Sequence, residues 1–297
     1  MSLVGLTKIE GNNIRRAIEK SLDLLGYAFN KDLRNVAIKI NACYYWDYST
    51  GQTTDPAFVA GLIDLIREQT SQRANISLVE ADASAMKCKY AFRMLGYEKM
   101  ANKRNVRLVN LSEVMADPCQ VTCNGHSFRF MVPQVISHAD LRINLPKIKY
   151  TGEPIKLTCA LKNIFGCNPY PKKFKYHPHL GETIVAINKA MKFDLSIIDG
   201  NIVSGIQPRK LGLVMASRDP VAIDAAAAQI AGISPRSIKY LQLAHNEGLG
   251  NMDFITKGLS MDQFKKLYPR KTIKKKLMAK AYSAVTRFGL GKRLGIG

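Results

Sequence analysis

Short segments rich in Val, Ile and Leu alternate along the chain with longer segments that have helical periodicity. The segments typical of β-strands are 36–40, 76–80, 106–109, 128–132, 141–145, 195–198 and 211–216. The segments typical of helices are 12–25, 56–69, 84–95, 181–192, 220–231, 235–247 and 272–288. Strands that alternate with helices of roughly 10–15 residues predict an α/β fold, with a mainly parallel or mixed sheet flanked by helices.

Positive charge is concentrated at the C-terminal end of the chain. The 297 residues include 44 Lys and Arg against 23 Asp and Glu, and residues 264–297 contain eleven basic residues and no acid. We therefore expect an α/β core domain over 1–262 and a basic amphipathic helical tail over 263–297. The apolar face of 272–288 either docks on the core or lies on an anionic membrane surface, and binding to nucleic acid is a third reading. No RNA-binding motif with interleaved aromatic residues supports that third reading.

The N-terminal segment has charges before any apolar core of a secretory signal, and no apolar stretch is long enough to span a membrane. The six cysteines lack the spacing of a disulfide framework, a zinc site or an iron–sulfur cluster. We therefore expect reduced thiols and a cytoplasmic location, peripheral at the membrane if the tail binds lipid. The cofactor stays unknown, and a divalent metal is one option.

Polar residues follow several of the predicted strands at the point where each strand ends. Lys39 and Asn41 share one face of the first strand, and Thr53 and Thr54 precede the next helix. The remaining strand-end residues are Asn144, Lys147 and Asp199. In open α/β sheets, ligands bind beyond the carboxyl ends of the strands, so these side chains predict one polar cleft. Two plainer readings stay open: Lys39 on a solvent-exposed edge strand, and Asp199 as a turn-forming residue before Gly200.

The segment 146–179 is rich in proline and has seven lysines and one acid, which is typical of a functional loop. It contains Lys162, Asn163 and His177. The hydroxyl-rich loop 49–54 leads into a helix start and can hold a phosphate or carboxylate, although the spacing of a P-loop is absent.

Several motifs occur in a fixed order between about residues 35 and 250. They are Val36-Ala-Ile-Lys-Ile-Asn41, Thr54-Asp-Pro56, Ile143-Asn-Leu-Pro-Lys147, Ala160-Leu-Lys-Asn-x-x-Gly166, His177, Ile198-Asp-Gly200 and Ala216-Ser-x-Asp-Pro-Val-Ala-Ile-Asp224. Together they resemble the domain-of-unknown-function 362 family (DUF362). The resemblance implies recurrent polar positions at Lys39, Asn41, Asn144, Lys147, Lys162, Asn163, His177, Asp199 and Asp219. Some members carry a fused ferredoxin module, but this sequence lacks the corresponding cysteine run, and the family has no settled activity to transfer.

These observations favour an enzyme that acts on an anionic small molecule, a carboxylate or a phosphate ester. The hypothesis assigns catalysis to Asp199 and Lys162. It assigns substrate binding to Lys39, Asn41, Thr53, Thr54, Asn144, Lys147, Asn163 and His177. Lysines would hold the anion, amides would orient it, and Asp199 would handle a proton or a divalent ion. The alternatives are a non-catalytic module recruited to an anionic membrane or nucleic acid by its tail and, third, an iron–sulfur redox protein.

Overall fold

The computed structural model describes residues 1–269, except 43, 154 and 206. The predicted helix over 272–288 and most of the expected basic tail lie outside the described residues.

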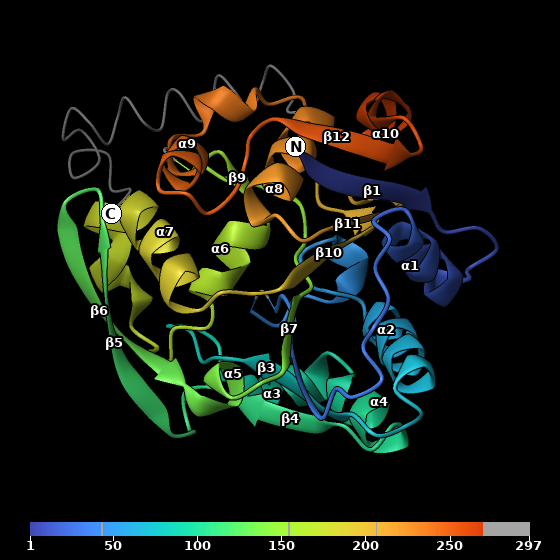
Figure 1. The fold of residues 1–297 in the computed structure, drawn as a ribbon, viewed down its shortest axis with the longest axis horizontal. Helices are drawn as coiled ribbons and strands as arrows, with labels where there is room; N and C mark the ends of the chain where they lie inside the picture. The colour runs from blue at the N-terminus through green and yellow to red at the C-terminus, as the bar shows by residue number, and fades with distance from the viewer. Residues whose placement is uncertain (43, 154, 206, 270–297) are drawn as a thin grey trace, which may run out of the picture.

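A mixed sheet of eight strands forms the centre of the molecule, in the order β12-β1-β11-β10-β7-β2-β3-β4 (Figure 1). The pairs β12–β1, β10–β7, β7–β2, β2–β3 and β3–β4 are parallel, whereas β11 is antiparallel to both of its neighbours. The strands of this sheet are β1 (Ser2–Lys8), β2 (Asn35–Lys39), β3 (Asn75–Glu80), β4 (Arg107–Asn110), β7 (Leu141–Asn144), β10 (Leu195–Val203), β11 (Arg209–Ser217) and β12 (Phe254–Gly258). The predicted α/β fold with a mixed sheet is therefore confirmed.

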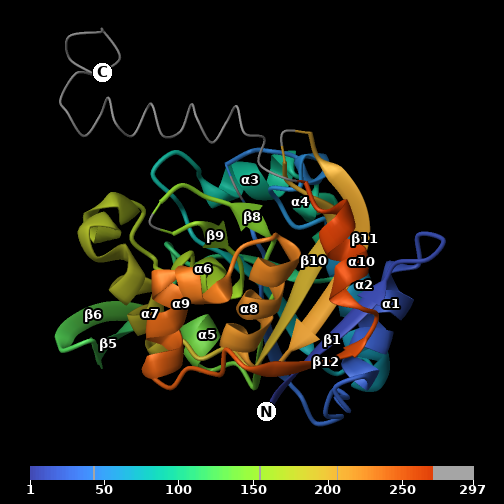
Figure 2. The ribbon, with the colours of Figure 1, turned by 90° about the horizontal axis from the view of Figure 1, so that it is seen from above.

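Helices cover both faces of this sheet, and Figure 2 shows α1 and α2 on one side of the strands and α6 to α9 on the other. The α-helices are α1 (Ile14–Asp23), α2 (Pro56–Gln69), α3 (Cys88–Met94), α4 (Tyr97–Lys103), α5 (Gln134–Ser137), α6 (Ala160–Phe165), α7 (Leu180–Ala190), α8 (Pro220–Ile230), α9 (Lys239–Asn246) and α10 (Met261–Leu267). Three 3₁₀ turns are η1 (Tyr48–Thr50), η2 (Lys173–His179) and η3 (Pro235–Ser237).

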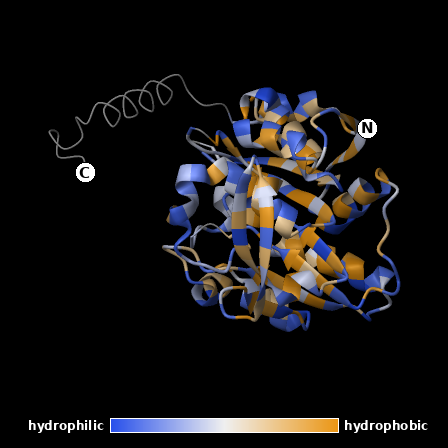
Figure 3. Ribbon diagram, turned by 60° about the vertical axis from the view of Figure 1, so that its left-hand side comes forward, coloured by the Kyte–Doolittle hydropathy of each residue, from blue (hydrophilic) through white to orange (hydrophobic). Residues whose placement is uncertain are grey.

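Two apolar cores lie between the sheet and its helical layers, because side chains alternate along each strand. On β2, Val36 and Ile38 join the core beneath α1 to α4, whereas Ala37 joins the core beneath α6 to α9. Hydrophobic residues accordingly run along the strands and the helix faces next to them (Figure 3). By the same alternation, Lys39 points to the side of the sheet that α6 covers.

Two hairpins lie outside the main sheet: β5 (Ala116–Cys123) with β6 (His126–Pro133), and β8 (Lys149–Tyr150) with β9 (Leu157–Thr158). The predicted strand 128–132 belongs to β6, so it does not extend the main sheet. Its Phe130 is buried in the core beneath α6 to α9, which explains its apolar pattern. The pattern also missed β1, whose Gly5 leaves room for the backbone of Ser21 in α1.

The chain changes direction within the sheet between β2 and β7. From β2 it continues to β3 and β4 on one side, and later returns to β7 and β10 on the other. Helix α2 follows β2 on one face, and α6 follows β7 on the opposite face. The connections after β2 and β7 therefore diverge, which defines a topological switch point of the kind that accommodates ligands in α/β proteins.

Helix α10 crosses the boundary expected between residues 262 and 263. Phe264 and Tyr268 are buried, and the Tyr268 hydroxyl donates to the carbonyl of Ile148 at 3.3 Å. The core therefore continues to at least Tyr268, because these two aromatic side chains pack against it. Within the part of the chain that the structure describes, no helix combines the length and apolar character needed to cross a membrane.

Candidate functional site

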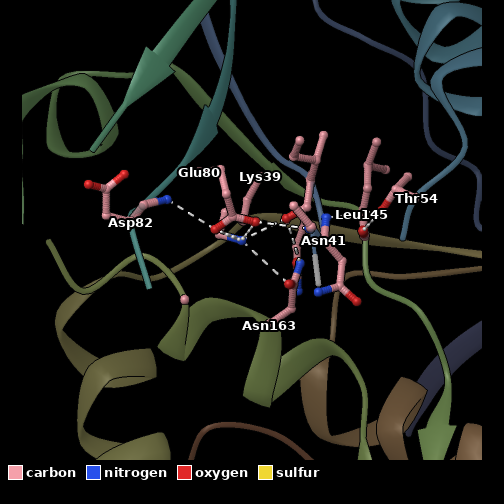
Figure 4. Close-up of polar contacts among 12 residues, drawn as sticks. Lys39, Asn41, Thr54, Glu80, Asp82, Leu145 and Asn163 are labelled. Atoms are coloured by element: carbon pink, nitrogen blue, oxygen red, sulfur yellow. Dashed lines mark hydrogen bonds and ion pairs between the residues drawn. The ribbon is translucent and has the colours of Figure 1, made fainter. Parts of the chain in front are cut away.

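Lys39 lies at the end of β2, on the switch point, and is only 1% exposed. Its ammonium donates to the Ile40 carbonyl at 2.6 Å and to the Glu80 carboxylate at 2.8 Å (Figure 4). A third, longer contact of 3.4 Å reaches Oδ1 of Asn163 on α6. Since β2 is a central strand between β7 and β3, the reading of Lys39 as a solvated edge-strand residue is wrong.

The ammonium of Lys39 has no unused hydrogen-bond donor. An ammonium has three donors, and all three of Lys39 are used. Glu80 in turn accepts from the backbone N–H groups of Ala42 and Ala81, both at 3.0 Å. A buried ion pair is tolerated when its remaining polar atoms are satisfied in this way. This pair is therefore a closed unit that joins β2 and β3 to α6.

Two asparagines extend the same network across the switch point. Asn144 ends β7 beside Lys39 in the sheet register, and its Oδ1 accepts from Nδ2 of Asn163 at 2.8 Å. Nδ2 of Asn144 donates to the Ala160 carbonyl at 3.0 Å. Asn41 pairs with Thr54 through its backbone, and its buried side-chain oxygen has no hydrogen-bond partner in the structure. The amides therefore hold α6 against β7, and Asn41 retains one unused acceptor.

A second buried ion pair joins Lys147 to Asp199 at 3.1 Å, with side-chain exposures of 1% and 0%. The Asp199 carboxylate also accepts from the backbone N–H of Asp55 at 2.8 Å and of Asn201 at 3.1 Å. Burial is the main cause that raises the pKa of Asp55, and the hydrogen bond from Ala57 opposes it. Asp199 therefore anchors the start of α2 to β10 and does more than form a turn.

The hydroxyls of the loop before α2 are used within the protein. Thr53 donates to the Trp46 carbonyl at 2.6 Å, and Thr54 donates to the Leu145 carbonyl at 2.9 Å. Both residues are fully buried. In the described conformation these two hydroxyl groups point to backbone acceptors, so a phosphate would have to displace existing hydrogen bonds to reach them.

Lys162 and His177 lie apart from this network, in a second location. Both line a cavity of about 540 Å³ whose other walls include Glu182 of α7 and Lys239 and Tyr240 of α9. Lys162 and Asn163 are consecutive on α6, and successive helical residues point about 100° apart. Asn163 therefore turns toward Lys39, while Lys162 turns toward the cavity.

Lys173 is a residue that the sequence patterns did not single out. Its ammonium donates to the Gly166 carbonyl at 3.0 Å, and a Cβ built on Gly166 would lie 3.1 Å from the ammonium of Lys39. Burial lowers the pKa of Lys173 to about 8; Glu80 opposes this shift and Lys39 adds to it. Lys173 is one of seven lysines in 146–179, and spacing offers no reason to choose it.

Asp224 lies in α8, within the helix predicted over 220–231, but the sequence patterns assign no role to its side chain. Its carboxyl accepts from the first N–H groups of α6, Ala160 at 2.6 Å and Leu161 at 3.2 Å. Burial raises the pKa of Asp224 to about 7, and these hydrogen bonds limit the shift. Asp219, by contrast, caps α8 through the N–H groups of Val221 and Ala222, as its position before Pro220 indicates.

The described residues contain no evident metal site. Among those residues, no three His, Cys, Asp or Glu side chains come together in a way that would hold a metal ion.

The doubly covered sheet and the lysine–asparagine network define an α/β protein with a buried polar centre at its topological switch point. The chain belongs to the family described as Domain of unknown function (DUF362), which matches residues 36–229 and so includes the whole network. The family that the motifs resemble is thereby confirmed.

Two known proteins are similar to parts of this chain. Thylakoid-associated protein sll1697 of Synechocystis sp. is 35% identical over 124 residues, which cover 37% of this chain and 38% of that protein. The structure of the lactate racemase apoprotein from Thermoanaerobacterium thermosaccharolyticum aligns with a TM-score of 0.46 and 14% identity. That alignment covers 78% of this chain and 58% of the racemase. In both cases the match spans less than two thirds of the other protein.

Proposed function

We propose that this protein is an enzyme that acts on an anionic small molecule, a carboxylate or a phosphate ester, in the cavity beside α6. One observation carries the proposal: α6 connects the buried network to this cavity, with Asn163 on the inner side and Lys162 on the outer side. The buried network would hold α6 rigidly, and the cavity would give a ligand access to Lys162.

The cavity suits a small charged ligand in size and composition. Its volume of about 540 Å³ falls within the range of ordinary ligand sites. Lys162 and Lys239 supply positive charge and His177 a group that can transfer a proton, while Glu153 and Glu182 also line the wall. The acidic residues favour a ligand whose anionic group is localised at the lysine side rather than spread over its whole surface.

A site in the cavity beside α6 gives Lys39, Lys147 and Asp199 positioning roles rather than contacts with the ligand. A catalytic group must touch the reacting molecule, and Asp199, Lys147 and Lys39 are almost completely buried in ion pairs. We assign these three, with Asn144 and Asn163, to positioning of α2 and α6. Lys162 would hold the developing negative charge and His177 would move the proton. These assignments are part of the proposal.

Ligand-induced stabilisation tests the proposed site. A panel of small carboxylates and phosphate esters is screened by thermal unfolding against the wild-type protein, Lys162→Ala and the control Lys31→Ala, which removes an exposed lysine outside the cavity. A ligand at a hundred times its Kd should stabilise the native state by about 2.7 kcal/mol. We expect Lys162→Ala to lose this shift and Lys31→Ala to keep it. An unchanged shift in Lys162→Ala would refute the site.

Native mass spectrometry of freshly purified protein would detect a metabolite or metal that the protein retains. A visible absorption spectrum and an iron assay on anaerobically purified protein test the third hypothesis, an iron–sulfur centre. Turnover of any ligand found in the screen is then followed by product analysis, with His177→Gln as the variant that should bind without turning over.

Recruitment to an anionic membrane is a second candidate function. It is favoured by the name of the thylakoid-associated relative and by the eleven basic residues over 264–297. Reversing the charge of Lys274, Lys275 and Lys276 to Glu in the full chain should abolish flotation with anionic vesicles at low salt, because each basic residue near such a surface contributes about 1 kcal/mol. Undiminished flotation, or flotation insensitive to salt, would contradict recruitment by the tail.

A further inference from the structure

Exposed aromatic side chains gather on three connecting segments. In the described part of the chain, the strongly exposed aromatic residues are 38–65% exposed, and all of them come from the β2–α2 connection, helix α3 and the segment after α6. We name this set the aromatic rim, and it consists of Tyr44, Trp46, Tyr48, Tyr90, Tyr170 and Phe174. Large rings left in water together usually mark an interaction surface.

Hydrogen bonds place the three segments side by side. The Tyr45 hydroxyl accepts from the backbone N–H of Lys87, just before α3, at 3.0 Å. Ser84 donates to the Pro171 carbonyl, next to Tyr170, at 3.2 Å. The rings of Tyr44 and Trp46 are in contact, with centroids 5.5 Å apart. The segments that carry the rim therefore lie next to one another beyond the carboxyl ends of β2 and β3.

Positive charge accompanies these rings. Lys87, Lys89, Lys172 and Lys175 are exposed on the same segments, and the ammonium of Lys175 lies 4.4 Å from the ring centroid of Tyr170. Asp82 is buried and forms an ion pair with Lys87. Among the described acidic residues of these segments, Asp47 is exposed. The surface therefore combines aromatic rings with a net positive charge.

We infer that the aromatic rim is a docking surface for an anionic lipid bilayer. Tyr and Trp rings prefer the headgroup region, where the ring contacts acyl chains and its polar atom stays hydrated. Lysines beside them attract anionic headgroups. A single-stranded nucleic acid platform would instead present stacked rings along a basic groove, whereas these rings occupy separate connections at one edge. The inference concerns neither the cavity beside α6 nor the tail, because no rim residue lines that cavity.

The chain offers a built-in reporter, since Trp46 is its only tryptophan and belongs to the rim. The full-length protein is mixed with vesicles of phosphatidylglycerol and phosphatidylcholine, and in parallel with phosphatidylcholine alone. We expect the Trp46 emission to shift to shorter wavelength, and brominated lipids to quench it, only with the anionic vesicles. Binding with no change at Trp46 would place the contact elsewhere, for example on the tail, and would overturn the inference.

Charge variants test the lysines directly. Neutralising two of the lysines beside the rim in Lys172→Gln/Lys175→Gln should weaken the Trp46-detected affinity about thirtyfold, at roughly fivefold per lysine. The matched control Lys31→Gln/Lys257→Gln removes the same charge from exposed positions off the rim and should have little effect. Equal weakening by both pairs would show that binding depends only on net charge and would overturn the inference. A Trp46 response to single-stranded RNA or an acidic protein, without one to vesicles, would overturn the lipid assignment.

Discussion

Replacing Lys39 with Met tests whether the buried pair at the switch point behaves as a closed unit. Methionine is close to the lysine stem in volume, so the change mainly removes the ammonium. Glu80, 3% exposed, then loses its counter-ion at 2.8 Å, although the N–H groups of Ala42 and Ala81 remain. Removing one partner of a buried ion pair typically costs about 3–5 kcal/mol, and the two remaining hydrogen bonds place the expected loss near the lower end, at about 3 kcal/mol.

Equilibrium urea unfolding followed by circular dichroism measures this loss as a lower midpoint at constant m-value. Glu80→Gln should be destabilising too, since it leaves Lys39 buried without a counter-charge. The double variant should cost at least about 2 kcal/mol less than the sum of the single variants, because neither charge is then left alone. The control Lys31→Met, at an exposed site, should change stability by no more than about 0.5 kcal/mol. A loss below about 1 kcal/mol for Lys39→Met, or additive single variants, would refute the closed-unit interpretation.

Two further predictions follow from perturbed ionisation. Burial raises the pKa of Asp224 from 3.8 to about 7, so the native state holds this proton more tightly than the unfolded state, and stability should fall as pH rises from about 4 through 7, by roughly 4 kcal/mol. Asp224→Asn should remove this part of the pH dependence in urea unfolding at pH 4–8, and an identical profile would contradict the assignment. Burial also lowers the pKa of Lys173 to about 8, so its trace acetylation, followed by peptide mass mapping, should reach half of its maximal rate near pH 8. A rate that keeps rising up to pH 10 would show that the ammonium is not desolvated as the structure indicates.

Local patterns anticipated much of the fold for reasons that lie within a few residues. Asp55-Pro56 and Asp219-Pro220 mark the starts of α2 and α8, because the aspartate oxygen reaches free N–H groups only two or three residues away. Because polar residues at the carboxyl ends of parallel strands meet at one edge of the sheet, the sequence predicts that Lys39 and Asn144 lie close together. In the structure they are register partners on β2 and β7. The position of a residue at a strand end does not show that its polar atoms form hydrogen bonds with other side chains of the protein.

Other features of the site depend on contacts between distant segments. The enzyme hypothesis groups Lys162 and His177 with Lys39, but the orientation of α6 turns Lys162 toward the cavity that His177 also lines, whereas Asn163 turns toward Lys39. Lys173 differs from its neighbouring lysines through Gly166 and the nearby Lys39, a position more than a hundred residues earlier in the chain. The aromatic rim likewise exists because three separate connections meet.

Periodicity and capping residues predict most of the helices and strands, and that an α/β sheet results, since these features depend on the backbone's immediate neighbours. Which lysines are buried in pairs, which face a cavity, and which carboxyl keeps a proton near neutral pH are decided only by packing. Desolvation and Coulomb energies depend on distances in space, and no spacing along a chain determines those distances.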